Sequence, residues 1–382
     1  MLECLTLHNF KSARDLEVPI SNLTVLSGLN GSGKSSVLQA ISLVRQSLLL
    51  SQSVRLPSLH LRGPLVQLGV ADDVISDRAT DNTIQIGLRV DGLQTHWISN
   101  ATVDSDILEI QLDALLPDPG ESYLRNCHFQ FLQADRLTPQ THYERSDSFS
   151  RDMGFLGAHG QFTPDYLAEH GDRLEVSLAR RCPKTASGLP NGLMDRIVAT
   201  PKLYDQISGW MQHLSPGVRL EAGRLSQTDL VSLRFSYAST EIAQGSGRRR
   251  PSNVGFGLTY CLPIVTACLA APQGAVLLLE NPEAHLHPRG QAALGTLLAK
   301  CAADGVQIIV ETHSDHVLNG IRLAVKHGEI AAEKVQLCNF TRDPVTGDSF
   351  IETPVVLANG ELTAWPEGFF DEWEKSLEEL LR

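Results

Sequence analysis

The sequence predicts an α/β fold in which short, buried strands alternate with helices at the two ends of the chain. Two observations carry this prediction. A strand-like run, 23–27, is followed by a glycine-rich turn and a helical stretch, 35–50, and the wholly apolar runs 275–279 and 306–310 each precede a helical pattern. Apolar strands of this kind are typical of a sheet covered on both faces. A turn-rich middle separates the two ends, which indicates an insertion.

Composition places the chain among globular proteins of a reducing compartment. Of its 382 residues, 42% are hydrophobic and 20% are charged, an ordinary balance. No apolar run has the length of a membrane span, and Met1–Thr6 lacks the basic flank and apolar core of a signal peptide. The seven cysteines are scattered and form no Cys-x-x-Cys pair, which favours reduced thiols. We therefore expect a cytoplasmic protein without a membrane partner.

The formal charge of −12 excludes a protein that coats nucleic acid with its whole surface. A nucleic-acid contact would need a local basic patch, for which Arg248–Arg250 is the candidate. Because this run follows Gly245-Ser246-Gly247, a solvated loop is the favoured interpretation, and DNA stays open as a partner.

The N-terminal elements are two short strands, 2–7 and 23–27, joined through a turn at Asn9-Phe10-Lys11-Ser12 and followed by a helix over 35–50. Between strand and helix, Gly28–Ser35 fits the pattern G-x-x-x-x-G-K-[ST]. Its glycines let backbone N–H groups surround phosphate oxygens at a helix N-terminus. The residues expected at ATP are Asn30, Gly31, Ser32, Gly33, Lys34, Ser35 and Ser36.

Within this P-loop, Lys34 is expected to contact the β- and γ-phosphates, and Ser35 to bind Mg²⁺. The alternative is a glycine-rich turn that binds no ligand. A strand before the motif and a helix after it favour the nucleotide site.

The middle of the chain predicts strands at 83–90, 107–112, 129–132 and 231–237 and a helix at 203–214. After it, the apolar run 275–279 ends in Glu280-Asn281-Pro282-Glu283, as a Walker B strand ends in acid. Glu280 is expected to reach the metal and Glu283 to polarise the attacking water. The alternative is a buried strand that ends in a polar turn.

Two further segments complete the candidate site. His313 follows the apolar run 306–310, where its ring can hydrogen-bond the γ-phosphate. The segment Ser252-Asn253-Val254-Gly255-Phe256-Gly257 opens a helical stretch over 258–269, and we expect Ser252, Asn253, Gly255 and Gly257 to bind the nucleotide of a second subunit. The alternative for this segment is an ordinary N-cap with glycines for close packing.

Together these motifs resemble the ABC-type ATPase heads of the SMC, RecF and OLD group, including small ATPases of anti-phage systems such as Septu. The similar residues are His8-Asn9-Phe10-Lys11-Ser12, the signature-like segment from Ser252, Glu280–Pro288 with its D-loop, and Glu311-Thr312-His313-Ser314. The resemblance places Lys11 near the adenine or ribose. The ending Trp365–Trp373 is similar to one subfamily of poorly defined function. The middle of the chain carries little of the resemblance.

The resemblance implies an ABC/SMC-type P-loop ATPase head with a central mixed sheet and a mid-chain insertion. The expected parts are an N-terminal lobe with Walker A (1–70), an insertion that serves as a lid, arm or partner-docking region (71–235), a C-terminal lobe with signature, Walker B and switch histidine (236–340), and a subfamily-specific tail (341–382).

The implied function is an ATP-hydrolysing switch that forms a homodimer or higher homo-oligomer around ATP and Mg²⁺. It would control a separately encoded effector, a nuclease, in anti-phage defence or DNA repair. Asn281 departs from the usual pattern, which has a catalytic Glu there, so Glu283 takes that role or hydrolysis is slow. A nucleotide-binding scaffold with little turnover is the alternative. A transporter ATPase is disfavoured by the long insertion.

Overall fold

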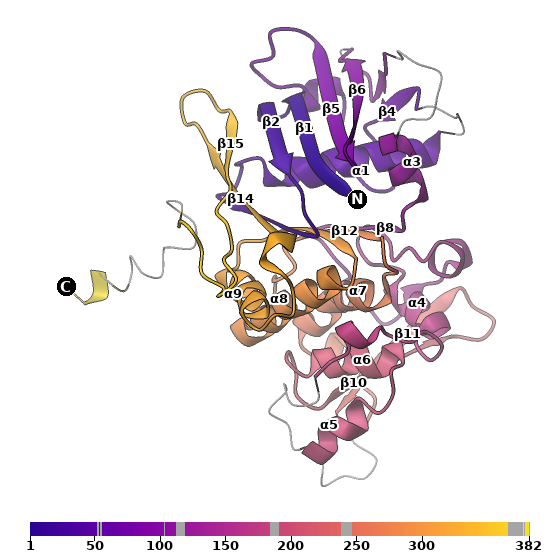
Figure 1. Cartoon of the computed structure of the whole chain (residues 1–382). Coiled ribbons are helices and arrows are strands. Elements are labelled where there is room, and N and C mark those ends of the chain that lie inside the picture. Colours follow the sequence, from indigo (N-terminus) through magenta and orange to yellow (C-terminus); the bar gives the residue numbers. More distant parts are fainter. Residues whose placement is uncertain are drawn as a thin grey trace. The chain divides into compact units, whose positions relative to one another are not determined.

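The computed structural model describes residues 1–51, 53, 56–102, 104–111, 119–183, 191–237, 247–365, 377 and 379–381. These residues form two compact units, each of which is described by itself (Figure 1). Unit 1 comprises Met1–Cys127, Gln307–His313 and Ala331–Arg382, and unit 2 comprises His128–Val306 and Ser314–Ile330. Both units combine helices and strands, so the predicted α/β class is confirmed. The predicted division into lobes, insertion and tail stays a prediction.

Unit 1 contains an antiparallel sheet in the order β2-β1-β5-β6, whose strands lie side by side in Figure 1. Its strands are β1 (Leu2–Phe10), β2 (Ala13–Pro19), β5 (Thr83–Val90) and β6 (Leu93–Asn100). Along β6 buried residues largely alternate with exposed ones, as in a strand with one face in the core and one in solvent. The buried Trp97 of β6 belongs to this core.

The second sheet of unit 1 is mixed and carries the P-loop. Its order is β15-β14-β3-β13, where β14 and β13 are parallel to β3 and β15 is antiparallel. The strands are β3 (Leu23–Gly28), β13 (Gln307–Glu311), β14 (Val335–Arg342) and β15 (Ser349–Glu352). Every residue of β13 is buried, which agrees with its apolar sequence. The remaining elements are α1 (Lys34–Leu50), β4 (Ser58–His60), α2 (Ala71–Val74), β7 (Ile107–Glu109), α3 (Pro119–Asn126) and η4 (Ala332–Lys334).

In unit 2, two parallel strands, β8 (Phe129–Leu132) and β12 (Val276–Glu280), are accompanied by three long helices. These helices are α7 (Phe256–Ala270), α8 (Pro288–Ala303) and α9 (Asp315–Lys326). The axes of α8 and α9 approach closely, because a Cβ atom on Gly320 would lie 2.1 Å from the Ala292 carbonyl oxygen. Ser314 caps α9, as its hydroxyl accepts a hydrogen bond from the Val317 N–H.

The rest of unit 2 surrounds a small antiparallel sheet in the order β10-β11-β9. Its strands and the nearby helices are β9 (Tyr143–Glu144), η1 (Asp147–Asp152), α4 (Thr163–His170), η2 (Leu178–Arg180), α5 (Asn191–Ile197), α6 (Leu203–Met211), β10 (Val218–Arg224), β11 (Leu230–Tyr237) and η3 (Pro251–Asn253). Within the described part of the chain, no helix is both long and apolar enough to span a membrane. Most of the predicted ending Trp365–Trp373 lies outside the described residues.

The predicted elements agree with the structure where apolar patterning is strong. The strands predicted at 83–90 and 129–132 have these bounds, and the helix at 35–50 starts one residue earlier. The helix predicted at 203–214 ends at Met211, and the strand that starts at Ile107 ends at Glu109. The sequence-based reading missed β2, whose charged residues obscure its alternation.

Candidate nucleotide-binding site

The loop between β3 and α1 has the backbone that a phosphate-binding loop requires. Gly28, Gly31 and Gly33 have φ angles of 129°, 76° and 102°, in the region that favours glycine. A Cβ atom on Gly28 would lie 2.1 Å from the Phe340 carbonyl oxygen, and one on Gly33 would lie 2.5 Å from Ser349 Oγ. The loop therefore leaves no room for side chains at its two ends. The first turn of α1 has no acidic residue, so the positive end of the helix is not compensated there.

Lys34 lies under this loop with its ammonium group among oxygen atoms. Its side chain is 3% exposed, and Nζ donates hydrogen bonds to the carbonyl oxygens of Gly28, at 3.0 Å, and Leu29, at 2.8 Å. Glu311 Oε1 is 3.8 Å from Nζ. Burial lowers the pKa of Lys34, and the charge of Glu311 opposes that shift. A buried cation held mainly by carbonyl groups suits an anionic ligand.

The residues of the loop fit a bound triphosphate. The Ser32 hydroxyl is buried and has no hydrogen-bond partner among the described residues, and a phosphate oxygen would supply one. Asn30 and Gly31 are exposed at the tip, and Ser35 is half-buried at the start of α1. Lys11, in the turn after β1, donates a hydrogen bond to Gln39 of α1 at 2.5 Å.

The switch strand β13 ends at the same sheet edge as the P-loop strand. β13 and β3 are parallel, with Glu311 opposite Leu26, and the Thr312 N–H donates to the Leu26 carbonyl at 3.0 Å. Glu311 is buried, whereas His313 is exposed two residues further on. His313 therefore lies at the edge of the sheet where β3 ends and the P-loop begins, as predicted.

In unit 2, the strand β12 ends in the predicted acidic turn. Glu280 Oε2 accepts a hydrogen bond from the Ala134 N–H at 3.0 Å. Asn281 has a φ of 41°, a left-handed conformation that non-glycine residues seldom adopt. Glu283, half-buried, follows Pro282 in this turn. Among the described residues there is no group of three or more His, Cys, Asp or Glu side chains that could hold a metal ion. Mg²⁺ at nucleotides needs only one or two protein ligands beside the phosphates.

A family model described as "AAA domain, putative AbiEii toxin, Type IV TA system" matches residues 23–319, well over half of the chain. The chain belongs to this AAA-domain family. A second model, described as a protein of unknown function (DUF3696), matches residues 330–380. A search of curated proteins gives no significant match. Family membership and the geometry of Gly28–Ser35 identify a P-loop ATPase domain, as the motifs predict.

Solved structures similar to this AAA-domain protein include SMC heads. The Smc head domain with an extended coiled coil bound to the C-terminal domain of ScpA, from Pyrococcus furiosus, has 13% sequence identity and a TM-score of 0.50, and the match covers 100% of this chain and 99% of that chain. This likeness shows an SMC-head fold. An SmcHead bound to the C-winged helix domain of ScpA has 14% identity, a TM-score of 0.48 and coverages of 93% and 98%. The SMC head domain from Thermotoga maritima has 14% identity, a TM-score of 0.42 and coverages of 92% and 98%.

The signature-like segment of this AAA-domain protein is arranged differently from the predicted helix start. Ser252 and Asn253 lie in the short helix η3, and α7 begins only at Phe256, with Gly255 as its N-cap residue. Ser252 therefore does not cap α7, and the cap position is held by Gly255. A Cβ atom on Gly257 would lie 2.5 Å from the His285 carbonyl oxygen, so this glycine allows α7 to pack on the turn after β12.

Three neighbours of the site were missed by sequence reasoning. Glu311 precedes the predicted His313 but was not recognised as the neighbour of Lys34. Ser349 of β15 lies against Gly33, and Arg342 of β14 donates to the Gly31 carbonyl at 3.5 Å. These two belong to the segment matched by the second family model. No motif marks them, because their proximity follows from the pairing of β14 with β3.

Proposed function

We propose that the protein binds ATP and Mg²⁺ at Gly28–Ser35 and acts as an ATP-hydrolysing switch. The observation that carries this proposal is the buried Lys34 ammonium group, held by the carbonyl groups of a loop with three left-handed glycines. Ser35 and Glu280 are the proposed Mg²⁺ ligands. Glu283, Glu280 and His313 are the proposed catalytic side chains, and Lys11 is the proposed contact of the base or ribose.

The test of the nucleotide site is Lys34→Ala, measured by calorimetry with Mg²⁺-ATP. Its loss removes the cation expected at the phosphates, so ATP affinity should fall by about 10²-fold or more, as loss of a charge-assisted contact implies. The control is Lys300→Ala, which removes a half-buried lysine paired with a carboxylate, Glu329, at 2.7 Å. ATP affinity that is equal in both variants would refute the P-loop assignment.

The proposed switch closes when two copies enclose ATP, with Ser252, Asn253, Gly255 and Gly257 of one copy on the nucleotide of the other. Gly255 is the position best suited to a test of ATP-driven dimerisation. Among the described residues other than its chain neighbours, no atom lies within 4 Å of a Cβ atom built there, whereas a Cβ atom on Gly257 meets the His285 backbone. Gly255→Leu should leave ATP binding by the monomer unchanged and block dimerisation by a non-hydrolysable analogue in light scattering. A mass that does not depend on nucleotide in the parent protein would contradict ATP-driven closure.

The proposed setting is DNA-linked anti-phage defence or repair, with residues 71–235 docking a separately encoded effector, a nuclease. The family description, which names a type IV toxin–antitoxin system, supports a defence role. The second candidate is a scaffold with little turnover, favoured by Asn281 at the usual position of the catalytic Glu. Steady-state turnover of Mg²⁺-ATP, with and without DNA, separates the two candidates. Negligible turnover under both conditions favours the scaffold.

A further inference from the structure

Unit 2 contains a buried arginine, Arg136, whose partners are backbone carbonyl groups. Arg136 lies in the loop after β8 and is 3% exposed. Nη1 donates to the carbonyl oxygens of Gln133, at 2.8 Å, and Glu280, and Nη2 donates to that of Asn281 at 2.7 Å. Burial lowers the pKa of Arg136 from its usual value. Burial of a charged arginine costs free energy, which its hydrogen bonds to these carbonyl groups offset.

The carbonyl groups that Arg136 binds belong to the turn that carries the proposed catalytic acid. Asn281 is left-handed with a φ of 41°, and its side-chain oxygen is buried without a hydrogen-bond partner among the described residues. The Asn281 carbonyl oxygen also accepts a hydrogen bond from the Ala284 N–H at 3.2 Å, which closes the turn locally. Arg136 adds a restraint from outside the turn, because its planar guanidinium group bonds two successive carbonyl groups at once.

The same guanidinium group lies over a ring of α7. The Arg136 Cζ atom is 4.3 Å from the centroid of the Tyr260 ring, within the range of a cation–π contact. Tyr260 and Phe256, one helical turn apart, both pack against the His285 ring, with centroid distances of 4.9 Å and 4.7 Å. His285 is the second left-handed residue of the turn, with a φ of 63°. One cluster thus joins the turn 280–286 to the start of α7.

The loop that carries Arg136 is itself fixed. The Gln133 N–H donates to the Ala158 carbonyl at 2.9 Å, and the Leu137 N–H donates to the His159 carbonyl at 2.8 Å. These two bonds bracket Arg136 and restrain its backbone on both sides. Its guanidinium group therefore extends from a restrained backbone and contacts both the turn after β12 and Tyr260 of α7.

We propose that Arg136 is a positioning residue that locks the turn after β12 to the signature-like start of α7. This inference rests on the proposed function, in which Glu283 acts on the nucleotide of one subunit and Gly255 meets that of the other. Because both segments are fixed by one side chain, catalysis and closure are coupled through Arg136. Losing it lets each segment move separately.

The decisive comparison is between Arg136→Lys and Arg180→Lys. Arg180 is also buried, and its Nη1 donates to the carbonyl groups of Cys268 and Ala271, but it is paired with Asp304 away from the turn. Both variants keep the charge and lose the fork, so both lose stability. Only Arg136→Lys should raise amide hydrogen exchange in 256–262 and 281–287. It should also lower kcat by about 10²-fold, the scale of a 1 Å misplacement, with the Kd for ATP unchanged.

Equal exchange and equal kcat in the two arginine variants would overturn the positioning role. If the parent protein does not hydrolyse ATP, the hydrolysis proposal fails, and the exchange comparison still decides the role of Arg136. Tyr260→Leu and Tyr260→Phe give a second test that keeps every Arg136 hydrogen bond. Raised exchange at 281–287 in the leucine variant alone supports the lock, and the same exchange in both contradicts it.

Discussion

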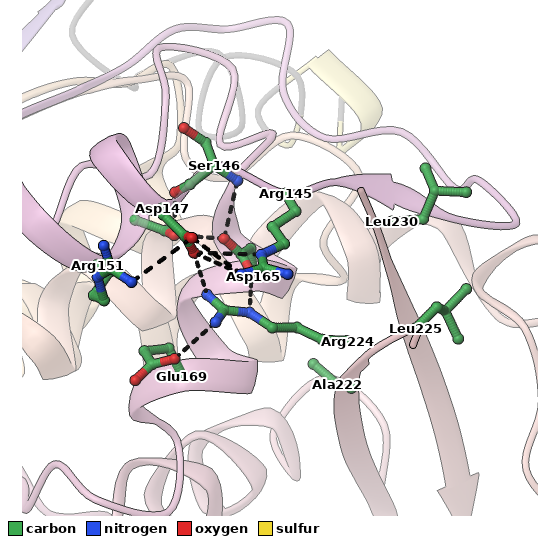
Figure 2. A network of polar contacts seen from close by, with 12 residues as sticks. Arg145, Ser146, Asp147, Arg151, Asp165, Glu169, Ala222, Arg224, Leu225 and Leu230 are labelled. Atoms are coloured by element: carbon green, nitrogen blue, oxygen red, sulfur yellow. Dashed lines mark hydrogen bonds and ion pairs between the residues drawn. The ribbon is translucent and has the colours of Figure 1, made fainter. Parts of the chain in front are cut away.

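Unit 2 holds two arginine clusters that differ in what their guanidinium groups bind. Arg224 of β10 is surrounded by carboxylates, at 2.7 Å from Asp165, 2.9 Å from Glu169 and 3.3 Å from Asp147 (Figure 2). Arg136 is bound by carbonyl groups of the turn after β12. The hydrogen bonds of Arg224 go to charged side chains, whereas those of Arg136 go to the backbone of a turn, with Glu283 and Glu280 adding charge nearby. We therefore expect the first cluster to affect stability and the second to affect function.

The Arg224 cluster links elements that are distant in sequence. Asp165 of α4 is fully buried and also accepts hydrogen bonds from Ser150 Oγ and from the Ser146 N–H, which start and hold η1. Figure 2 shows Asp147 of η1 facing Arg145, Arg151 and Arg224. These contacts fasten η1 and β10 to α4.

The largest expected effect is on stability, from Asp165→Asn. Removing one partner of a buried ion pair typically lowers the free energy of unfolding by about 3–5 kcal/mol. ATP affinity at low temperature should stay that of the parent protein. The control, Asp152→Asn, removes the partner of Arg151 in an exposed pair and should leave the urea midpoint unchanged. A loss of ATP affinity in Asp165→Asn would break the distinction between the two clusters.

The next effect is on turnover, in the turn that Arg136 holds. Glu283→Gln should spare ATP binding, lower turnover by about 10²-fold, the scale of a general base, and trap the ATP-bound dimer. Glu280→Gln, in contrast, should weaken Mg²⁺-dependent binding and turnover together. If Glu283→Gln hydrolyses ATP like the parent, Glu283 is not the base.

A smaller effect is the response of unit 2 to acid. Burial raises the pKa of Asp165, but hydrogen bonds from Arg224, Ser150 and Ser146 outweigh it, so the pKa lies below its usual value. A depressed carboxyl pKa adds stability above the unfolded value of about 3.9, which is lost as pH falls through the folded value. Urea midpoints should thus be level near neutrality and fall below about pH 4. Asp165→Asn should flatten this fall, and an unchanged slope would assign it to other carboxyl groups.

These two clusters also show what the sequence reveals. Apolar runs and the glycine-rich motif predict β12, β13 and the P-loop, because burial and backbone conformation restrict the residue types there. Arg136 was missed, since its acceptors are carbonyl groups 144 and 145 positions away that any residue could supply. Ser252 and Asn253 were predicted at a helix start, but η3 intervenes, because Pro251 opens a separate turn. Patterns of neighbouring residues predict the local structure. Contacts to backbone carbonyl groups do not depend on residue type, so the sequence does not reveal them.

The smallest expected effect comes from alanine substitutions at two glycines of unit 1. One glycine lies in the P-loop and the other in a hairpin away from it. Gly31 of the P-loop and Gly92 of the β5–β6 hairpin have φ angles of 76° and 78°. In the described part of the chain, a Cβ atom meets nothing nearer than 4.0 Å at Gly31 and nothing within 4 Å at Gly92. Alanine at either position should therefore cost only the left-handed backbone energy, about 1–2 kcal/mol. Gly31→Ala should in addition weaken ATP binding in calorimetry, because the loop N–H groups turn away from the phosphates. Equal ATP affinity in both variants, with equal losses of stability, would mean that the backbone at Gly31 serves the fold alone.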